Sequence, residues 1–369
     1  MRDQKNNTKK LIFTVTNDLN YDQRMIRICS SLQRAGFDVL LVGRKRKTSI
    51  QLQPQPFTQK RLSLFFEKGK AFYIEYNLRL LFYLLFKKFD LVCAIDLDTI
   101  VPCYLTSLLK RKKRVYDAHE LFCEMKEIVS RPKIYSFWKR IEKHTVPHFQ
   151  KGYTVNKPIR DIFERTYGVN YEVIMNVPFY IKTADQNPEG FIIYQGAVNE
   201  GRSFETLIPA FQWINYPLHI FGEGNFIDEC HSLIKKYNVQ DKVLLKGKVL
   251  PADLSSITPK ALFGITLFEN NGLNNYYSLS NRFFDYIQAG IPQLGVKYPA
   301  YQDINKEFEV ALLIEDLSPT SIASAINELA TNNALRMKLK ENCLKAKEVY
   351  NWKNEEIKLV AFYQKVFQN

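Results

Sequence analysis

The sequence predicts two α/β domains, each built on a doubly wound parallel sheet, that face one another across a cleft. Its 369 residues are too many for one ordinary α/β core and suit two domains. Short apolar runs alternate with helical segments, and these runs are continuously apolar, as expected of parallel strands buried on both faces. The alternation stops around residues 171–187 and then restarts, which indicates a boundary between domains.

The first half opens with a β-α-β unit. We predict a strand at Leu11–Thr16, a helix at Tyr21–Ala35 and a strand at Phe37–Val42, with Gly36 where a helix C-cap is expected. The same reasoning gives further elements in this half. The strands are Leu91–Ile95, Arg114–Tyr116 and Gly152–Val155, and the helices are Ala71–Phe86, Thr99–Leu109 and Tyr135–Val146.

The second half repeats this pattern after the proline-containing linker. Its predicted strands are Phe191–Gln195, Leu218–Phe221, Val243–Lys246, Phe263–Leu267 and Gln293–Val296, with helices at Phe204–Trp213 and Asn225–Tyr237. We place the first domain at residues 1–180 and the second at residues 181–350.

Charge is divided unequally between the two halves. Residues 1–180 carry 33 Lys and Arg against 17 Asp and Glu, whereas residues 181–369 carry 19 against 21, for a net charge of +14 overall. The basic half favours a polyanionic partner, either nucleic acid, anionic lipid or a phosphorylated acceptor, although a solvated basic surface without a partner gives the same count.

Compartment and membrane contact follow from the apolar segments. The polar start of the chain lacks the apolar core of a signal peptide, and the six cysteines have no CxxC spacing, so we expect free buried thiols in the cytoplasm. Ala71–Phe86 contains charged residues and is too short to span a bilayer. We expect this helix to be mainly buried, and its flanking lysines would also suit a position on anionic lipid at the inner face of the membrane.

Three segments of the second half are candidates for binding a nucleotide. Gly196, Gly201 and Arg202 lie in a loop between a strand and a helix, where backbone N–H groups and the helix dipole attract an anion. Gly222 and Glu223 turn the chain after the next strand. In the third segment the loop Ser278, Leu279, Ser280, Asn281 leads into a helix that carries Asp285. A carboxylate there can accept hydrogen bonds from a ribose diol, while the alternative makes Ser280 an N-cap and Asp285 a dipole residue.

The order of these segments, GAVNEGR, FGEGN, VLLKGKV and DYIQAGIPQLG, resembles the donor-binding domain of GT-B glycosyltransferases of the retaining family 4 type, which have two Rossmann-like domains. In that family an Arg follows the first glycine, where this chain has Ala197, and a Lys matches Arg202. Of the family's paired glutamates, the second matches Asp285 and the first falls on Tyr277. The resemblance therefore assigns the donor sugar to other groups, such as Glu269 or the Asn270, Asn271, Asn274 and Asn275 loop.

In the first half, the segment VYDAHELF resembles the family segment whose His contacts the donor sugar or diphosphate, which implies that role for His119, with Glu120 beside it. Asp22 and Arg24 either line the cleft on the acceptor side or hold their loop to the domain. Asp96-Leu97-Asp98 has the D-x-D pattern of metal sites, but we expect a loop and N-cap role there and predict no metal.

Together these residues predict a glycosyltransferase without a cofactor. The second domain binds a nucleotide diphosphate-sugar and the first a saccharide or lipid-linked acceptor in cell-surface polysaccharide assembly. The resemblance implies retention of configuration and a closing helix, within residues 351–369, that crosses back to the first domain. The alternatives are a nucleotide-sugar epimerase of the same fold and a basic protein that binds nucleic acid or anionic lipid; the scattered basic clusters argue against a nucleic-acid partner.

Overall fold

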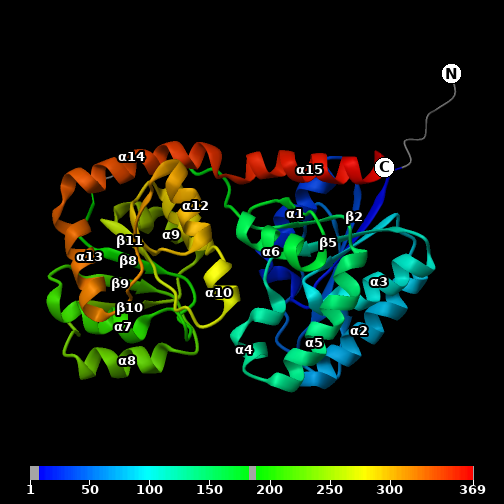
Figure 1. The fold of residues 1–369 in the computed structure, drawn as a ribbon, viewed down its shortest axis with the longest axis horizontal. Helices are drawn as coiled ribbons and strands as arrows, with labels where there is room; N and C mark the ends of the chain where they lie inside the picture. Colours follow the sequence, from blue (N-terminus) through cyan, green and yellow to red (C-terminus); the bar gives the residue numbers. More distant parts are fainter. Residues whose placement is uncertain (1–7, 183–187, 369) are drawn as a thin grey trace. The chain divides into compact units, whose positions relative to one another are not determined.

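The computed structural model describes residues 8–182 and 188–368, which form two compact units (Figure 1). Unit 1 contains the chain as far as Asn176 together with the segment from Glu355 onward, and unit 2 is Val177–Asn354. Each unit contains one sheet in which all strand pairs are parallel, with helices between most successive strands; β2 and β3 are joined by a loop. Both units therefore have the doubly wound α/β architecture that the sequence predicts.

The sheet of unit 1 has seven strands in the order β3-β2-β1-β4-β5-β6-β7. Their bounds are β1 (Lys10–Thr14), β2 (Asp38–Lys45), β3 (Thr58–Ser63), β4 (Leu91–Ile95), β5 (Lys113–Ala118), β6 (Gly152–Thr154) and β7 (Glu172–Val173). The strand order reverses between β1 and β4. In open parallel sheets, ligands bind beyond the carboxyl ends of the strands at this switch point.

The helices of unit 1 are α1 (Gln23–Arg34), α2 (Gly69–Phe86), α3 (Ile100–Leu109), α4 (Lys126–Val129), α5 (Pro132–Thr145), α6 (Lys157–Tyr167) and most of α15 (Trp352–Gln368). Although α15 comes last in the chain, it packs on the sheet of unit 1. The ring of Tyr363 lies 5.8 Å from that of Phe13, and its hydroxyl lies 3.2 Å from the Tyr153 hydroxyl.

The sheet of unit 2 has six strands in the order β10-β9-β8-β11-β12-β13, so its switch point lies between β8 and β11. The strands are β8 (Ile192–Gln195), β9 (Leu218–Phe221), β10 (Val243–Gly247), β11 (Phe263–Thr266), β12 (Gln293–Val296) and β13 (Ala311–Ile314). The helices are α7 (Phe204–Ala210), α8 (Ile227–Lys236), α9 (Pro251–Ile257), α10 (Leu273–Tyr277), α11 (Asn281–Ala289), α12 (Pro299–Phe308), α13 (Pro319–Thr331) and α14 (Asn333–Val349).

Each strand predicted from the sequence is present, with ends that shift by up to three residues. The sequence missed β3, β7 and β13. The predicted linker begins too early, because Glu172–Val173 still pairs with β6, and its residues 183–187 lie outside the described part of the chain. The polar start, residues 1–7, also lies outside it.

The expectation that residues 71–86 are mainly buried is wrong. Only Phe72, Tyr76, Leu80 and Leu84 of α2 are buried, whereas Ile74, Leu78, Phe82 and Phe86 are exposed. Within the described residues, no helix combines the length and apolar character needed to cross a bilayer. The six cysteines are free and buried, as expected from their sequence contexts.

Candidate functional site

In unit 2, two glycine turns pack closely together at the carboxyl ends of β8 and β9. The amide of Gly196 donates to the Phe221 carbonyl at 2.9 Å, and that of Val198 donates to the Glu223 carbonyl at 3.0 Å. A Cβ added to Gly222 would lie 1.8 Å from the carbonyl oxygen of Gly196. Glycine is therefore required at position 222, because any side chain would separate the two turns.

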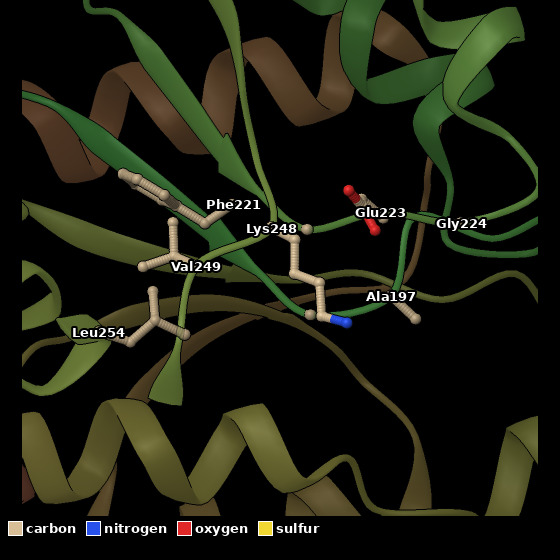
Figure 2. Close-up of a pocket in the computed structure, with 9 residues that line it drawn as sticks. Ala197, Phe221, Glu223, Gly224, Lys248, Val249 and Leu254 are labelled. Carbon is tan, nitrogen blue, oxygen red and sulfur yellow. The ribbon is translucent and has the colours of Figure 1, made fainter. Parts of the chain in front are cut away.

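These turns line a cavity of about 530 Å³ (Figure 2). Phe221, Val249 and Leu254 form its apolar wall, and Gly196, Ala197, Gly222, Glu223, Gly224 and Lys248 complete it. Figure 2 shows the Lys248 side chain extending toward the turn at Ala197. An apolar wall facing exposed backbone and one cation suits a ligand that has a flat ring and a negative charge.

The second glycine of the loop contacts the segment that follows β11. The Glu269 amide donates to the Gly201 carbonyl at 3.1 Å, and a Cβ on Gly201 would lie 2.7 Å from the Asn271 amide nitrogen. Burial and the neighbouring Glu269 carboxylate raise the pKa of Glu205, which lies in the first turn of α7. The structure thus brings together Gly201, Glu269 and Asn271, and adds Glu205, which the sequence did not single out.

Asp285 lies on α11 beside the carboxyl end of β8. The Gln195 side-chain amide donates to its carboxylate at 3.4 Å, and the Thr258 hydroxyl holds Gln195 in place at 2.7 Å. Asp285 follows the first turn of the helix, so it is not a dipole residue there, and Ser280 occupies the N-cap position without a side-chain capping bond. Ser278 is already engaged, since its amide donates to Asn274 at 2.9 Å.

Two arginines meet at one aromatic ring near this helix. The guanidinium carbon of Arg202 lies 4.5 Å from the centroid of the Phe268 ring, and that of Arg282 lies 5.1 Å from the same centroid. Arg282 also lies 4.0 Å from the centroid of the Tyr194 ring. The Tyr194 hydroxyl donates to the Ala197 carbonyl at 2.7 Å. Arg282 is thereby linked to the glycine turn, although it follows it by about ninety residues along the chain.

In unit 1, His119 follows β5 and lies beside Asp96, which follows β4. The distance from His119 Nε2 to Asp96 Oδ2 is 3.1 Å, and His119 Nδ1 is buried without a hydrogen-bond partner among the described residues. Asp96 has φ 53° and ψ 178°, a backbone conformation that residues other than glycine rarely adopt. Such strain is typical of functional positions. Asp96 occupies the N-cap position of the short 3-10 helix Leu97–Thr99, as the sequence predicts, although its side chain makes no capping bond.

Several carboxyl groups gather around this histidine. Burial, followed by the charges of Glu120, Asp98 and Asp117, raises the pKa of Asp96 well above its ordinary value. Burial raises the pKa of Asp98 to about 7, while a 2.5 Å hydrogen bond from the Thr16 hydroxyl acts in the opposite direction. In the described chain, no three His, Cys, Asp or Glu residues are arranged to hold a metal ion.

The two predicted acceptor-side residues at the start of α1 have different roles. Arg24 is buried and its guanidinium donates to both oxygens of Asp117, at 2.8 and 3.3 Å, so it holds its loop to the domain. Asp22 caps α1 by accepting from the Met25 amide at 3.1 Å. Asp22 also lines a cavity of about 480 Å³, together with Asn17, Asp18, Tyr21, Arg46 and Thr48.

The sequence therefore singled out many of the residues that follow the strands, but it missed Arg282 and Lys248, and it gave Asp96 a loop and N-cap role without its contact to His119. For Lys248 a usable signal existed, since it follows a predicted strand within VLLKGKV. For Arg282 no local signal existed, because its burial depends on rings from β8 and from the segment after β11.

Comparisons with known proteins agree with the fold of the two units. A family model for Glycosyltransferase Family 4 matches residues 23–178, and a model for Glycosyl transferases group 1 matches residues 181–346. Sucrose-phosphate synthase from Thermosynechococcus elongatus is 14% identical with a TM-score of 0.76, covering 98% of this chain and 99% of its own. No curated protein matches the chain.

Two further structures have the same fold. HepE from Anabaena in complex with UDP-glucose is 10% identical with a TM-score of 0.73, covering 96% of this chain and 99% of its own. WaaG, a glycosyltransferase involved in lipopolysaccharide biosynthesis, is 15% identical with a TM-score of 0.70, covering 95% and 98%.

Proposed function

Because the chain is a glycosyltransferase of the GT-B type, we propose that it transfers a sugar from a nucleotide diphosphate-sugar to a saccharide or lipid-linked acceptor in cell-surface polysaccharide assembly. Unit 2 is the proposed donor-binding domain and unit 1 the acceptor-binding domain. The UDP-glucose bound to HepE and the lipopolysaccharide role of WaaG support the two halves of this proposal.

The observation that carries the donor assignment is the pair of interlocked glycine turns beside Asp285. The apolar wall of Phe221, Val249 and Leu254 would hold the base, with Glu223 at its edge. Asp285 would accept hydrogen bonds from the ribose diol, because an ionised carboxylate offers only acceptors. Arg202 would contact the diphosphate bidentately. Gly196 and Gly201 would allow the phosphates to approach the backbone.

In the proposed reaction, the bond between the anomeric carbon and the diphosphate oxygen breaks, and negative charge grows on the leaving diphosphate, where preorganised donors such as Arg202 lower the barrier. The acceptor oxygen bonds to the anomeric carbon and passes its proton to the departing diphosphate oxygen, so that a nucleoside diphosphate leaves. His119 is the proposed hydrogen-bond partner of the donor sugar or its diphosphate, and its Nδ1 has no other partner among the described residues. Retention of configuration is proposed from the family resemblance alone, and we propose no metal.

The cavity at Tyr21 is the proposed acceptor site of unit 1. Tyr21 is exposed and Asp22 is half-buried, and this pair would contact a sugar ring and one of its hydroxyl groups. The Asp18 carboxylate is buried and already accepts from Arg61 and Ser49, so we assign it no contact with the acceptor. Arg46 would suit a phosphate on the acceptor. Glu120, beside His119, remains a proposed acceptor contact, whereas Arg24 is proposed only to position the loop.

We also propose that unit 1 rests on an anionic membrane through the α2 face, defined as Ile74, Leu78, Phe82 and Phe86. These side chains are 62%, 51%, 59% and 85% exposed and recur every four residues, so they form one apolar stripe. Figure 1 shows α3 beside α2, and the Lys110 ammonium donates to the Lys87 carbonyl at 2.7 Å. Lys87, Lys88, Lys110 and Arg111 thus border the stripe, as they would at a negatively charged surface.

Sedimentation with phosphatidylglycerol and phosphatidylcholine vesicles tests the membrane proposal. Lys87→Glu with Lys88→Glu should weaken binding to the anionic vesicles by more than ten-fold, because each lysine contributes about 1 kcal/mol. Lys235→Glu with Lys236→Glu is the matched control, since these lysines end α8 and the net charge changes equally. Similarly, Ile74→Ser should weaken binding more than Ile357→Ser, whose parent side chain is 64% exposed on α15. If each α2-face variant weakens vesicle binding no more than its matched control does, the α2 face is not the membrane contact.

Thermal denaturation with UDP, GDP and their sugar conjugates tests the donor proposal. A ligand at about 100 times its Kd should stabilise the protein by about 2.7 kcal/mol. Product analysis with the donor alone then distinguishes a transferase from an epimerase. Conversion of the donor sugar to an epimer without any acceptor would replace the transferase with an epimerase, and no stabilisation by any of these nucleotides would overturn the donor site.

A further inference from the structure

Arg282 is a buried cation without an anionic partner. The residue is 7% exposed, it forms no ion pair with any described residue, and its Nη1 is buried without a hydrogen bond. Its favourable contacts are with the faces of the Tyr194 and Phe268 rings, at 4.0 and 5.1 Å. Cation–π contacts stabilise a buried guanidinium less than its burial without a paired anion destabilises it.

The position of Arg282 indicates which anion would offset this cost. Arg282 is the second residue of the nine-residue helix α11, whose N-terminal dipole also favours negative charge. Phe268 is shared with Arg202, so the two guanidinium groups lie at the same ring. Through Tyr194, Arg282 is also next to the carbonyl of Ala197 in the glycine turn.

We propose that Arg282 supplies the second positive charge of the diphosphate site and, with Arg202, binds the two phosphate groups of the donor. This inference rests on the proposed function. It explains how the turn can carry Ala197, which offers no charge, because the missing cation comes from α11 instead. Diphosphate binding gives Arg282 the charge-assisted hydrogen bonds that it lacks in the described chain.

Two measurements on Arg282→Met test the proposal, since methionine keeps the apolar stem and removes the charge. Affinity for UDP should fall about ten- to a hundred-fold, the range expected for hydrogen bonds to a charged group, while affinity for uridine should change less than two-fold. Arg282→Lys should recover part of the UDP affinity. If GDP is the nucleotide that stabilises the wild type, GDP and guanosine replace UDP and uridine in this experiment.

The melting temperature of the ligand-free protein separates binding from a structural role. Removing an uncompensated buried charge should leave the melting temperature of Arg282→Met unchanged or raise it. Arg114→Met is the control, because Arg114 lies 5.1 and 6.0 Å from two rings in unit 1, and its loss should leave UDP affinity unchanged.

The outcomes distinguish this inference from the function on which it rests. If the wild type binds no nucleoside diphosphate, the donor site itself is wrong. If the wild type binds UDP and Arg282→Met binds it equally well, or loses uridine and UDP affinity in parallel, then Arg282 does not contact the phosphates and the inference alone is overturned.

Discussion

The two units share one strand order but present opposite chemistry at the switch point. In unit 2 the carboxyl ends of the strands carry glycine turns, Lys248, Arg202 and Arg282. In unit 1 the corresponding ends carry buried carboxyl groups beside His119. The same backbone architecture therefore carries the proposed anion site in one unit and a cluster of acidic groups in the other, because function depends on the residues that follow the strands.

The net charge of each half is opposite in sign to the charge of the residues at its strand ends. Residues 1–180 hold the excess of Lys and Arg, yet the acidic cluster lies there, while the cationic site lies in the nearly neutral half. The basic excess of unit 1 is thus separate from the proposed donor site. Four of its residues, Lys87, Lys88, Lys110 and Arg111, border the α2 face, so the surface charge and the site charge would serve two different proposed partners.

The largest expected effect is on turnover of the nucleotide-sugar and follows from the loss of Arg202 in unit 2. Arg202→Met should lower the turnover of the nucleotide-sugar about a hundred-fold or more, because the leaving diphosphate loses a preorganised cation. Steady-state kinetics measures this change, with Arg202→Lys as the variant that keeps the charge. If the turnover of Arg202→Met stays within a few-fold of the wild-type value, the proposed anion site of unit 2 is wrong.

The substitution of Asp285 should have the next largest effect. It should lower the affinity for the nucleotide through the ribose and leave the phosphate contacts unchanged. Asp285→Ala should weaken UDP binding about ten-fold or more, since hydrogen bonds to a charged group contribute about 1.5–3 kcal/mol. A 2′,3′-dideoxy nucleotide provides the control, because it lacks both ribose hydroxyls and should bind the variant and the wild type equally. If the variant discriminates against this analogue as strongly as the wild type does, Asp285 does not hold the ribose.

How far the sequence predicted these features depends on whether their signal is local. Continuous apolar runs revealed the central strands, while β3 was missed because Thr58–Ser63 is polar and only Leu62 in it is buried. The glycine turns were visible for the same reason, since glycine spacing is local. Arg282 was not visible, and Asp96 was visible only as a loop residue, because burial by distant rings and a strained φ arise only from tertiary packing.

The α2 helix was misjudged through its composition. Apolar residues on most faces favour burial, but the sheet of unit 1 covers only one side of α2, and Phe82 and Phe86 remain exposed. A sequence cannot distinguish a helix that the protein buries from one that a membrane would cover, because both use the same apolar side chains.

In unit 1, His119→Ala should lower donor turnover about ten-fold, a smaller effect than the loss of Arg202, since one hydrogen bond to the sugar or diphosphate contributes about 1 kcal/mol or slightly more. Asp96→Asn should have a weaker effect in the same direction, because Asp96 acts through the imidazole at 3.1 Å. Kinetics on both variants checks this order. An unchanged rate for His119→Ala would leave unit 1 without a contact to the donor.

The smallest expected effect concerns pH and stability. Because burial raises the pKa of Asp98 from 3.8 to about 7, the folded state holds a proton that the unfolded state releases near pH 4. This group should therefore stabilise the protein at low pH and lose that contribution as pH rises from about 4 to 7.

The Asp98→Asn variant has no ionisable group at this position. Its melting temperature should therefore decline less over this interval, by roughly 2–4 °C per kcal/mol in a domain of this size. Calorimetry of unit 1 unfolding at several pH values tests this, with Asp161→Asn as the control, because the Asp161 side chain is 48% exposed on α6. Parallel pH profiles for wild type and Asp98→Asn would mean that the carboxyl cluster of unit 1 is solvated, and its contrast with the cations of unit 2 would disappear.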